Sequence, residues 1–243
     1  MRNITLIQGE YYHLYNRGVD KRTIFTSPAE YKRFLAYLFL LNDAEHKRVD
    51  YLLASKKPIW EAKPSRPLIA IGAYCLMPNH FHLYVTQMAD GGISKFMQRI
   101  QTAYTMYFNK KHGRTGSLLQ GTFKSQHVAG DVYAKYLLSY IHLNPAKLKD
   151  PRWKTRGSRQ LKALASHVRD YPYSSFQEYA RNEHLITAPA AFPSHLATSR
   201  DLHAHIADWM EAKSLEGLAF QREGGDLGRR EVGEAQGAGY NKE

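Results

Sequence analysis

The sequence is poor in the features that mark several large protein classes. Its 243 residues contain one cysteine, Cys75, which excludes an intramolecular disulfide and argues against a cysteine-based zinc site. Because Cys75 stands in an apolar segment, we expect a buried and unreactive thiol. No stretch approaches the roughly 18 uninterrupted apolar residues of a membrane-spanning helix, and the first residues lack the apolar core of a signal peptide. No glycine-rich nucleotide loop occurs. These absences predict a soluble, cytoplasmic protein with no membrane partner.

Positive charge, in contrast, is plentiful. The chain has 34 Lys and Arg against 22 Asp and Glu, a formal net charge of +12, which favours a polyanionic partner. The densest basic run is 145–170, directly after a predicted helix. This run is either an ordinary solvated loop or a loop that follows nucleic-acid phosphates, in which Trp153 would stack on an unpaired base.

Other basic residues follow the first predicted strand and the end of a long predicted helix. Contacts from such residues give salt-sensitive affinity for nucleic acid without reading its base sequence. The residues that we expect to contact DNA are Arg17, Lys21, Arg22, Lys110, Lys111, Arg114, Lys124, Arg152, Trp153, Lys154 and Arg156.

Hydrophobic periodicity predicts one domain in which strands and helices alternate. The β-α-β-β-α-β order is typical of an α+β fold of the ferredoxin-like or RRM-like type, an antiparallel sheet with helices on one face and the second face free for a ligand. We expect a domain over 1–180, a short helical extension over 181–220 and a disordered tail over 221–243. The predicted elements are a strand at 11–16, a helix at 29–44, an irregular excursion at 45–66, a hairpin of 68–76 and 80–87, a helix at 92–111, a strand at 125–128 and a helix at 131–144.

Two histidines stand two residues apart in the second strand of the hairpin. Side chains alternate along a strand, so His80 and His82 point to one face while Phe81 and Leu83 point to the other. Two imidazoles on a rigid sheet form a natural half of a divalent-metal site. On spacing alone, however, such a pair is more often a pair of surface or hydrogen-bonded histidines.

The predicted helix 131–144 carries a row of polar aromatic residues that ends in an amide. Tyr133, Tyr136, Tyr140 and Asn144 follow one another at steps of three, four and four, so they share one face. For the first two tyrosines, an ordinary place in an amphipathic core is the favoured interpretation.

Tyr140 and Asn144 gain meaning in combination with the histidines. A tyrosine can attack a phosphodiester and hold the product as a covalent phosphotyrosine. That reaction needs a cation on the scissile phosphate. Mg²⁺ or Mn²⁺ accepts imidazole and amide oxygen ligands, so His80, His82 and Asn144 could hold the cation while Tyr140 faces the phosphate.

Four sequence blocks, taken in order, resemble the REP-associated tyrosine transposases within the single-tyrosine HUH transposase family. The opening EYYHLYNRGVDKRTIF (10–25) is also similar to the first strand and turn of that family, and the resemblance spans about three quarters of the chain. Leu119 departs from it, since a tryptophan is usual before the glutamine of the second block. The four blocks are MPNHFHLYV (77–85), GRTGSLLQGTFKS (113–125), YLLSYIHLNPAK (136–147) and DYPYSSFQEY (170–179).

The resemblance implies an α+β fold of the HUH-endonuclease type with a C-terminal extension. It implies that His80 and His82 bind Mg²⁺ or Mn²⁺, that Tyr140 is the nucleophile and that Asn144 is the further metal ligand. The implied activity is cleavage and joining of single-stranded DNA through a 5′-phosphotyrosine, on palindromic repeats that fold into hairpins. The family contains dimers as well as members expected to act alone; a monomer is favoured here and a homodimer is possible.

Two other functions stay open at this point. A non-catalytic module that binds single-stranded nucleic acid would use exposed aromatic residues on the sheet to stack bases. A replication or mobilisation relaxase would share the metal and tyrosine site, although the sequence shows nothing that resembles a helicase domain.

Overall fold

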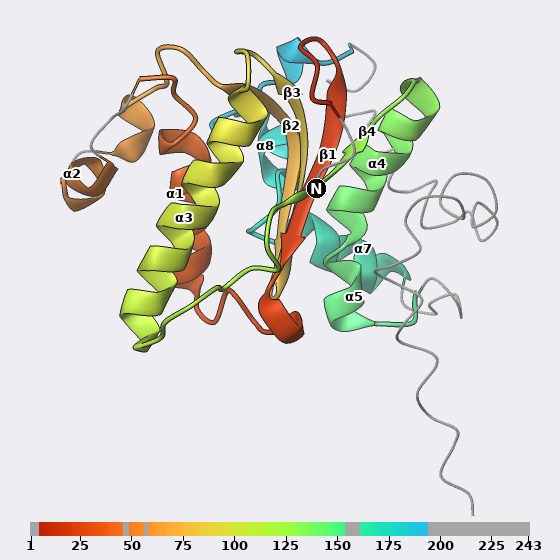
Figure 1. Ribbon diagram of the computed structural model, residues 1–243. Coiled ribbons are helices and arrows are strands. Elements are labelled where there is room, and N and C mark those ends of the chain that lie inside the picture. The colour runs from red at the N-terminus through yellow and green to blue at the C-terminus, as the bar shows by residue number, and fades with distance from the viewer. Residues whose placement is uncertain (1–4, 46–48, 56–57, 154–160, 194–243) are drawn as a thin grey trace, which may run out of the picture.

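The fold is organised around a four-stranded antiparallel sheet. In the computed structural model the described residues are 5–45, 49–55, 58–153 and 161–193 (Figure 1). The sheet order is β2-β3-β1-β4, which places β1 and β3 at its centre. A two-residue turn, Pro78-Asn79, joins β2 to β3. The strands are β1 (Tyr11–Arg17), β2 (Ile69–Met77), β3 (His80–Gln87) and β4 (Lys124–His127).

Two long helices cover one face of this sheet (Figure 1). α1 (Pro28–Leu40) buries Phe34 and Leu38, while α3 (Gly92–His112) buries Phe96, Ile100 and Tyr104 at helical spacing. Between α1 and β2 the chain makes α2 (Val49–Ala54) and η2 (Ile59–Glu61), in agreement with the irregular excursion that the sequence predicts. No helix in the described ranges is long and apolar enough to cross a membrane.

The second face of the sheet is also covered. α4 (Asp131–Leu143) packs over β2 and β3, and its Leu137 and Ile141 are buried with Ala73, Cys75 and Tyr84. The α+β class and the antiparallel sheet are therefore confirmed, but the prediction that the second face is free for a ligand is wrong. The helices α5 (Ala146–Lys149) and α7 (Leu161–Asp170) follow on this side (Figure 1), and α8 (Phe176–Arg181) comes after a bridge between Ser174 and Cys75 on the edge strand β2.

The basic run after α4 is largely helical in its described parts, which corrects the prediction of a loop. The packed unit also continues past the boundary expected at residue 180. The Ala188 amide donates to the Ile71 carbonyl at 2.8 Å, just before η3 (Pro189–Ala191), and the Phe192 ring lies 4.8 Å from that of Tyr84. The predicted helical extension and tail lie mostly beyond 193, outside the described residues.

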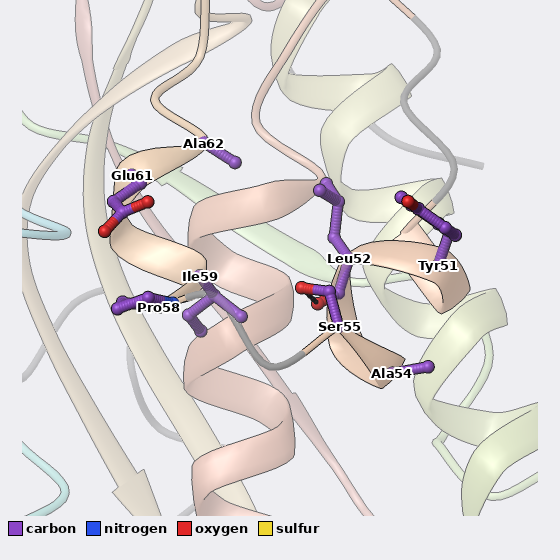
Figure 2. Close-up of a pocket in the computed structure, with 8 residues that line it drawn as sticks. All are labelled: Tyr51, Leu52, Ala54, Ser55, Pro58, Ile59, Glu61 and Ala62. Carbon is purple, nitrogen blue, oxygen red and sulfur yellow. Dashed lines mark hydrogen bonds between the residues drawn. The ribbon is translucent and has the colours of Figure 1, made fainter.

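A pocket opens in the excursion between α1 and β2. Figure 2 shows it between α2 and η2, lined by Tyr51, Leu52, Ala54, Ser55, Pro58, Ile59, Glu61 and Ala62. This pocket belongs to the α1 side of the molecule, because η2 packs on α1 and the Trp60 ring contacts Phe39 with centroids 5.1 Å apart. None of the described residues that line it is a histidine, and it lies on the face opposite α4.

A buried carboxylate joins the start of α1 to the end of α3. Glu30 is fully buried, and it accepts hydrogen bonds from Lys111 Nζ and His112 Nε2 at 2.7 Å and from Thr26 Oγ1 at 2.9 Å. Burial by itself raises the pKa of Glu30, but the hydrogen bonds outweigh it and lower the pKa to about 2. The carboxylate is therefore charged at neutral pH and holds the two helices together.

Glu30→Gln should destabilise the fold by about 2 kcal/mol, because it removes charge-assisted hydrogen bonds at a buried site. The folded pKa is depressed, so the contribution of Glu30 is complete above its ordinary value of 4.5 and is lost as pH falls towards 2. Denaturant melts at several pH values should show the gap between wild type and variant closing over that range.

Glu10→Gln is the matched control. Its partner His127 and Glu10 itself are both well exposed, so the loss should be under about 1 kcal/mol. Equal losses for the two variants would contradict the role of Glu30.

Candidate active site

The centre of the second sheet face carries a cluster of histidines. His13 on β1 stands opposite Tyr84 on β3, so His82, two residues along β3, is its diagonal neighbour on the same face. Nε2 of His13 lies 2.9 Å from Nδ1 of His82, and both side chains are almost fully buried. His80 stands half-buried at the start of β3, with its Nδ1 2.6 Å from Oδ1 of Asn79.

The helix α4 brings the predicted tyrosine and amide to this cluster. The Tyr140 ring meets His82 edge-on at a centroid distance of 5.4 Å, and it meets His13 at 6.2 Å. Asn144, one turn later, is 2 % exposed and donates from Nδ2 to the Tyr140 carbonyl at 2.9 Å. Lys147 places its Nζ 5.9 Å from the centre of the Tyr140 ring. The structure thus brings the Tyr140 ring to His82, whose own ring lies 5.0 Å from that of His80, and it places Asn144 beside Tyr140.

The earlier tyrosines of α4 stay beside the site. Tyr133 stacks on Tyr136, and Tyr136 on Tyr140, with centroids 6.2 Å apart in each pair. Both are half-buried, and Tyr133 packs against the buried cluster that contains Leu137 and Ile141, which is close to the amphipathic-core role that the sequence favoured.

The donor atoms of the site fit a divalent cation. Nε2 of His82 and Oδ1 of Asn144 are buried and have no hydrogen-bond partner among the described residues. If Nδ1 of His80 donates to Asn79, its Nε2 carries a lone pair. Two imidazoles and an amide oxygen suit Mn²⁺ or Mg²⁺ with positions left for water and phosphate. In the described part of the chain no group of three His, Cys, Asp or Glu side chains could hold a metal, so such a site depends on the amide.

Burial prepares these groups in their neutral forms. It lowers the pKa of His80 to about 3, with Arg17 and Lys147 adding to the shift, and it lowers the pKa of His82 well below the usual value. A metal ligand must be an unprotonated imidazole, so both rings are ready at neutral pH. Burial raises the pKa of Tyr140 to about 12, although hydrogen bonding to the Asn144 side chain opposes that shift.

One group of the predicted DNA contacts stands next to His80. Arg17 pairs with His80 across β1 and β3, and the turn that follows holds η1 (Val19–Lys21). The Gly18 amide donates to the Asn79 carbonyl at 2.9 Å, and Asn79 Nδ2 donates to the Lys21 carbonyl at 3.1 Å. A Cβ at Gly18 would lie 2.3 Å from a backbone oxygen of Arg22, so only glycine lets the turn close here. Arg17, Lys21 and Arg22 therefore flank the site.

The other predicted contacts divide into three sets. Lys111 is engaged with Glu30, and Arg114 donates to Asn109 Oδ1 at 3.0 Å, so both have structural roles. Lys110, Lys124 and Arg152 are exposed, and Lys154 and Arg156 lie outside the described residues.

Trp153 does not suit the role that the sequence suggested. The side chain is 4 % exposed and belongs to the same buried cluster as Leu137 and Ile141 of α4. An indole in that position cannot stack on a base unless it leaves the core, so we omit Trp153 from the interface.

His13 is the site residue that the sequence analysis missed. A signal for it exists in β1, where Tyr11, His13 and Tyr15 alternate and so share one face. Only the antiparallel register of β1 against β3 reveals that this face is the one carrying His82.

One family model matches part of this chain. Residues 56–144 match the model of a family described as IS200-like transposases. The matched segment is 89 of the 243 residues long. It contains His80, His82, Tyr140 and Asn144, and the predicted resemblance to a transposase family is confirmed at this level.

A solved structure is also similar to this chain. It is a structure of a REP-associated tyrosine transposase bound to a REP hairpin, with 14 % sequence identity and a TM-score of 0.46 over 81 % of this chain and 89 % of that one. No curated protein matches the chain.

Asn144 offers a test of whether these donor atoms bind a divalent cation. Asn144→Ala removes both the unpartnered Oδ1 and the Nδ2 donor that caps α4. We expect the Mn²⁺ dissociation constant to rise about ten-fold or more, and stability to fall by about 1 kcal/mol. Isothermal titration with Mn²⁺, together with a melting curve, measures the two effects.

Asn144→Asp separates the two roles of this side chain. It keeps an oxygen ligand and loses the donor, so it should retain Mn²⁺ binding while sharing the loss of stability. If Asn144→Ala binds Mn²⁺ with wild-type affinity, Asn144 is not a metal ligand and only caps the helix.

Proposed function

We propose that the chain is a metal-dependent endonuclease and strand transferase for single-stranded DNA, of the single-tyrosine HUH type. The observation that carries this proposal is the packing of the Tyr140 ring against His82, beside two buried atoms, His82 Nε2 and Asn144 Oδ1, that have no partner in the described residues. Such unpartnered buried atoms are rare in proteins and suggest a place for a ligand. A nucleophile and a cation site beside it are the two parts that phosphodiester cleavage requires.

In the proposed reaction the Tyr140 hydroxyl oxygen attacks a DNA phosphorus and loses its proton to solvent. A new P–O bond forms to the tyrosine while the bond from phosphorus to the 3′ oxygen breaks. The departing 3′ oxygen takes up a proton as a free 3′-OH, and the other product is a 5′-phosphotyrosine. His80, His82 and Asn144 would hold a divalent cation, which would supply charge stabilisation and orientation of the phosphate. Attack by another 3′-OH reverses the step and joins strands, so no ATP is needed.

We further propose a REP-associated role, with palindromic repeats folded into hairpins as the substrate. This part rests on the sequence blocks that resemble such transposases. The exposed cations near the site suit a phosphate backbone, since Lys21 follows β1 and Lys124 lies opposite Tyr15 on the edge strand β4. The chain is proposed to act as a monomer.

The non-catalytic alternative is less well supported by the fold. A sheet that stacks bases needs exposed aromatic rings on its open face. Here α4 covers that face, and Tyr84 at its centre is 1 % exposed. A relaxase would share the site geometry and would be distinguished by its substrate.

Tyr140→Phe should abolish the covalent protein–DNA adduct and leave DNA binding intact, because it removes only the attacking oxygen. Denaturing gel electrophoresis with 5′- and 3′-labelled single-stranded hairpins, in the presence of Mn²⁺, detects the adduct and shows which end it carries. Binding is measured in parallel by fluorescence anisotropy.

Tyr136→Phe is the matched control, because Tyr136 stacks on Tyr140 from one turn earlier in the same helix. It should retain the adduct. If the adduct persists in Tyr140→Phe and disappears in Tyr136→Phe, the nucleophile is Tyr136 and not Tyr140.

The exposed cations should add affinity without base preference. Replacing Lys21 and Lys124 by Gln should flatten the dependence of log affinity on log salt by about 0.7 for each phosphate that the protein no longer neutralises. Lys111→Gln is the control, since its ammonium is bound to Glu30 and should affect the melting temperature and not the salt slope. An unchanged slope in the double variant would place the DNA elsewhere on the surface.

A further inference from the structure

One buried histidine has no role in the proposed reaction. His13 is 3 % exposed at the centre of β1, where a core would usually place an apolar side chain. Its ring stacks on that of His82 with centroids 5.1 Å apart and planes 23° from parallel, and it also contacts the rings of Tyr15 at 4.9 Å and Tyr140 at 6.2 Å. The ring is therefore held on three sides.

The contact between the two histidines has a direction. A neutral imidazole carries one N–H and one lone pair, so one ring donates and the other accepts across the 2.9 Å between His13 Nε2 and His82 Nδ1. If His13 donates, the proton of His82 sits on Nε2, a buried nitrogen with no partner in the described residues. If His82 donates, its Nε2 carries a lone pair and can bind a cation.

We propose that His13 is a positioning residue that accepts the Nδ1 proton of His82 and so fixes the tautomer and the orientation of that ring. Nε2 of His82 is then presented as a lone pair beside Tyr140. A ligand histidine commonly donates its second N–H to a fixed acceptor, which sets the ring orientation and strengthens the ligand. The proposal deepens the proposed function and rests on it, because the tautomer matters to catalysis only where His82 binds a cation.

A purely structural role for the pair explains the contacts less well. Two buried histidines joined by one hydrogen bond leave Nδ1 of His13 and Nε2 of His82 without partners in the described residues. Two apolar residues of similar volume would fill the same space without an unpaired polar atom. A ligand bound to one of those nitrogens would explain why the protein keeps two histidines at this buried position.

The tautomer can be tested without metal and without DNA. Long-range ¹H–¹⁵N spectra of the metal-free, ¹⁵N-labelled protein should show His82 protonated at Nδ1. His13→Leu removes the acceptor and should shift the proton of His82 to Nε2. His13→Gln can accept from nearly the same place as Nε2 of His13, so it should restore the wild-type pattern.

Metal binding provides the second measurement. We expect the Mn²⁺ dissociation constant to rise ten- to a hundred-fold in His13→Leu, and to stay within a few-fold of wild type in His13→Gln. His127→Leu is the control for the loss of one histidine, because His127 lies on β4, bound to Glu10 at 2.6 Å and away from the pair. Melting curves confirm that each variant is folded. His13→Asn, whose amide is too short to reach His82, replaces His13→Leu if the latter does not fold.

The outcomes separate the two proposals. A wild-type His82 protonated at Nε2, or a folded His13→Leu with wild-type Mn²⁺ affinity, overturns the role of His13 and leaves the proposed function standing. A wild-type protein that binds no Mn²⁺ and forms no tyrosine adduct overturns the proposed function, and the role of His13 with it.

Discussion

The packing of α4 across the second face of the sheet is the contact on which the candidate site depends. Leu137 and Ile141 are fully buried against small strand residues, Ala73 and Cys75, which let the helix approach closely. Burying each of these large side chains stabilises the fold by roughly 1.5–3 kcal/mol. The same seam carries Tyr140 one position before Ile141, so the apolar contact that anchors the helix also fixes the distance from the tyrosine to the histidines.

That stabilisation offsets a cost that the site imposes on the fold. His13 Nδ1, His82 Nε2 and Asn144 Oδ1 are buried without partners in the described residues. Each such atom costs about 1–3 kcal/mol, so the three together rival the burial of two large apolar residues. A sequence selected for stability alone would replace them. Unpartnered buried polar atoms beside a tyrosine are typical of a functional site, where a protein keeps residues that lower its stability.

The sequence predicted what depends on local pattern and missed what depends on register or on distant partners. The hairpin and the helices on either side of it follow from spacing and turn signals, whereas the approach of Tyr140 to His82 was expected from the chemistry of the residues and from the family resemblance. His13 enters only through the pairing of β1 with β3, which no local pattern reveals. Lys111 was predicted to contact DNA because its true partner, Glu30, stands 81 residues earlier in the chain, too far for a local pattern to reveal the pairing. The burial of Trp153 and the covering of the second sheet face are likewise products of tertiary packing, which single-sequence periodicity does not encode.

Burial acts in opposite senses on the two kinds of group in this site, and both effects bear on the proposed chemistry. It lowers the pKa of His80 to about 3, which keeps a lone pair available at every physiological pH. It raises the pKa of Tyr140 to about 12, which makes the phenol a poor nucleophile by itself.

The attacking oxygen therefore needs positive charge close by. Lys147, 5.9 Å from the ring centre, supplies one such charge from the chain itself. Because that ammonium is exposed and screened by water, the larger share in the proposed reaction would come from a cation held at the buried donor atoms. Under the proposed function, a tyrosine set in this environment should remain inert until the cation and the DNA are both bound.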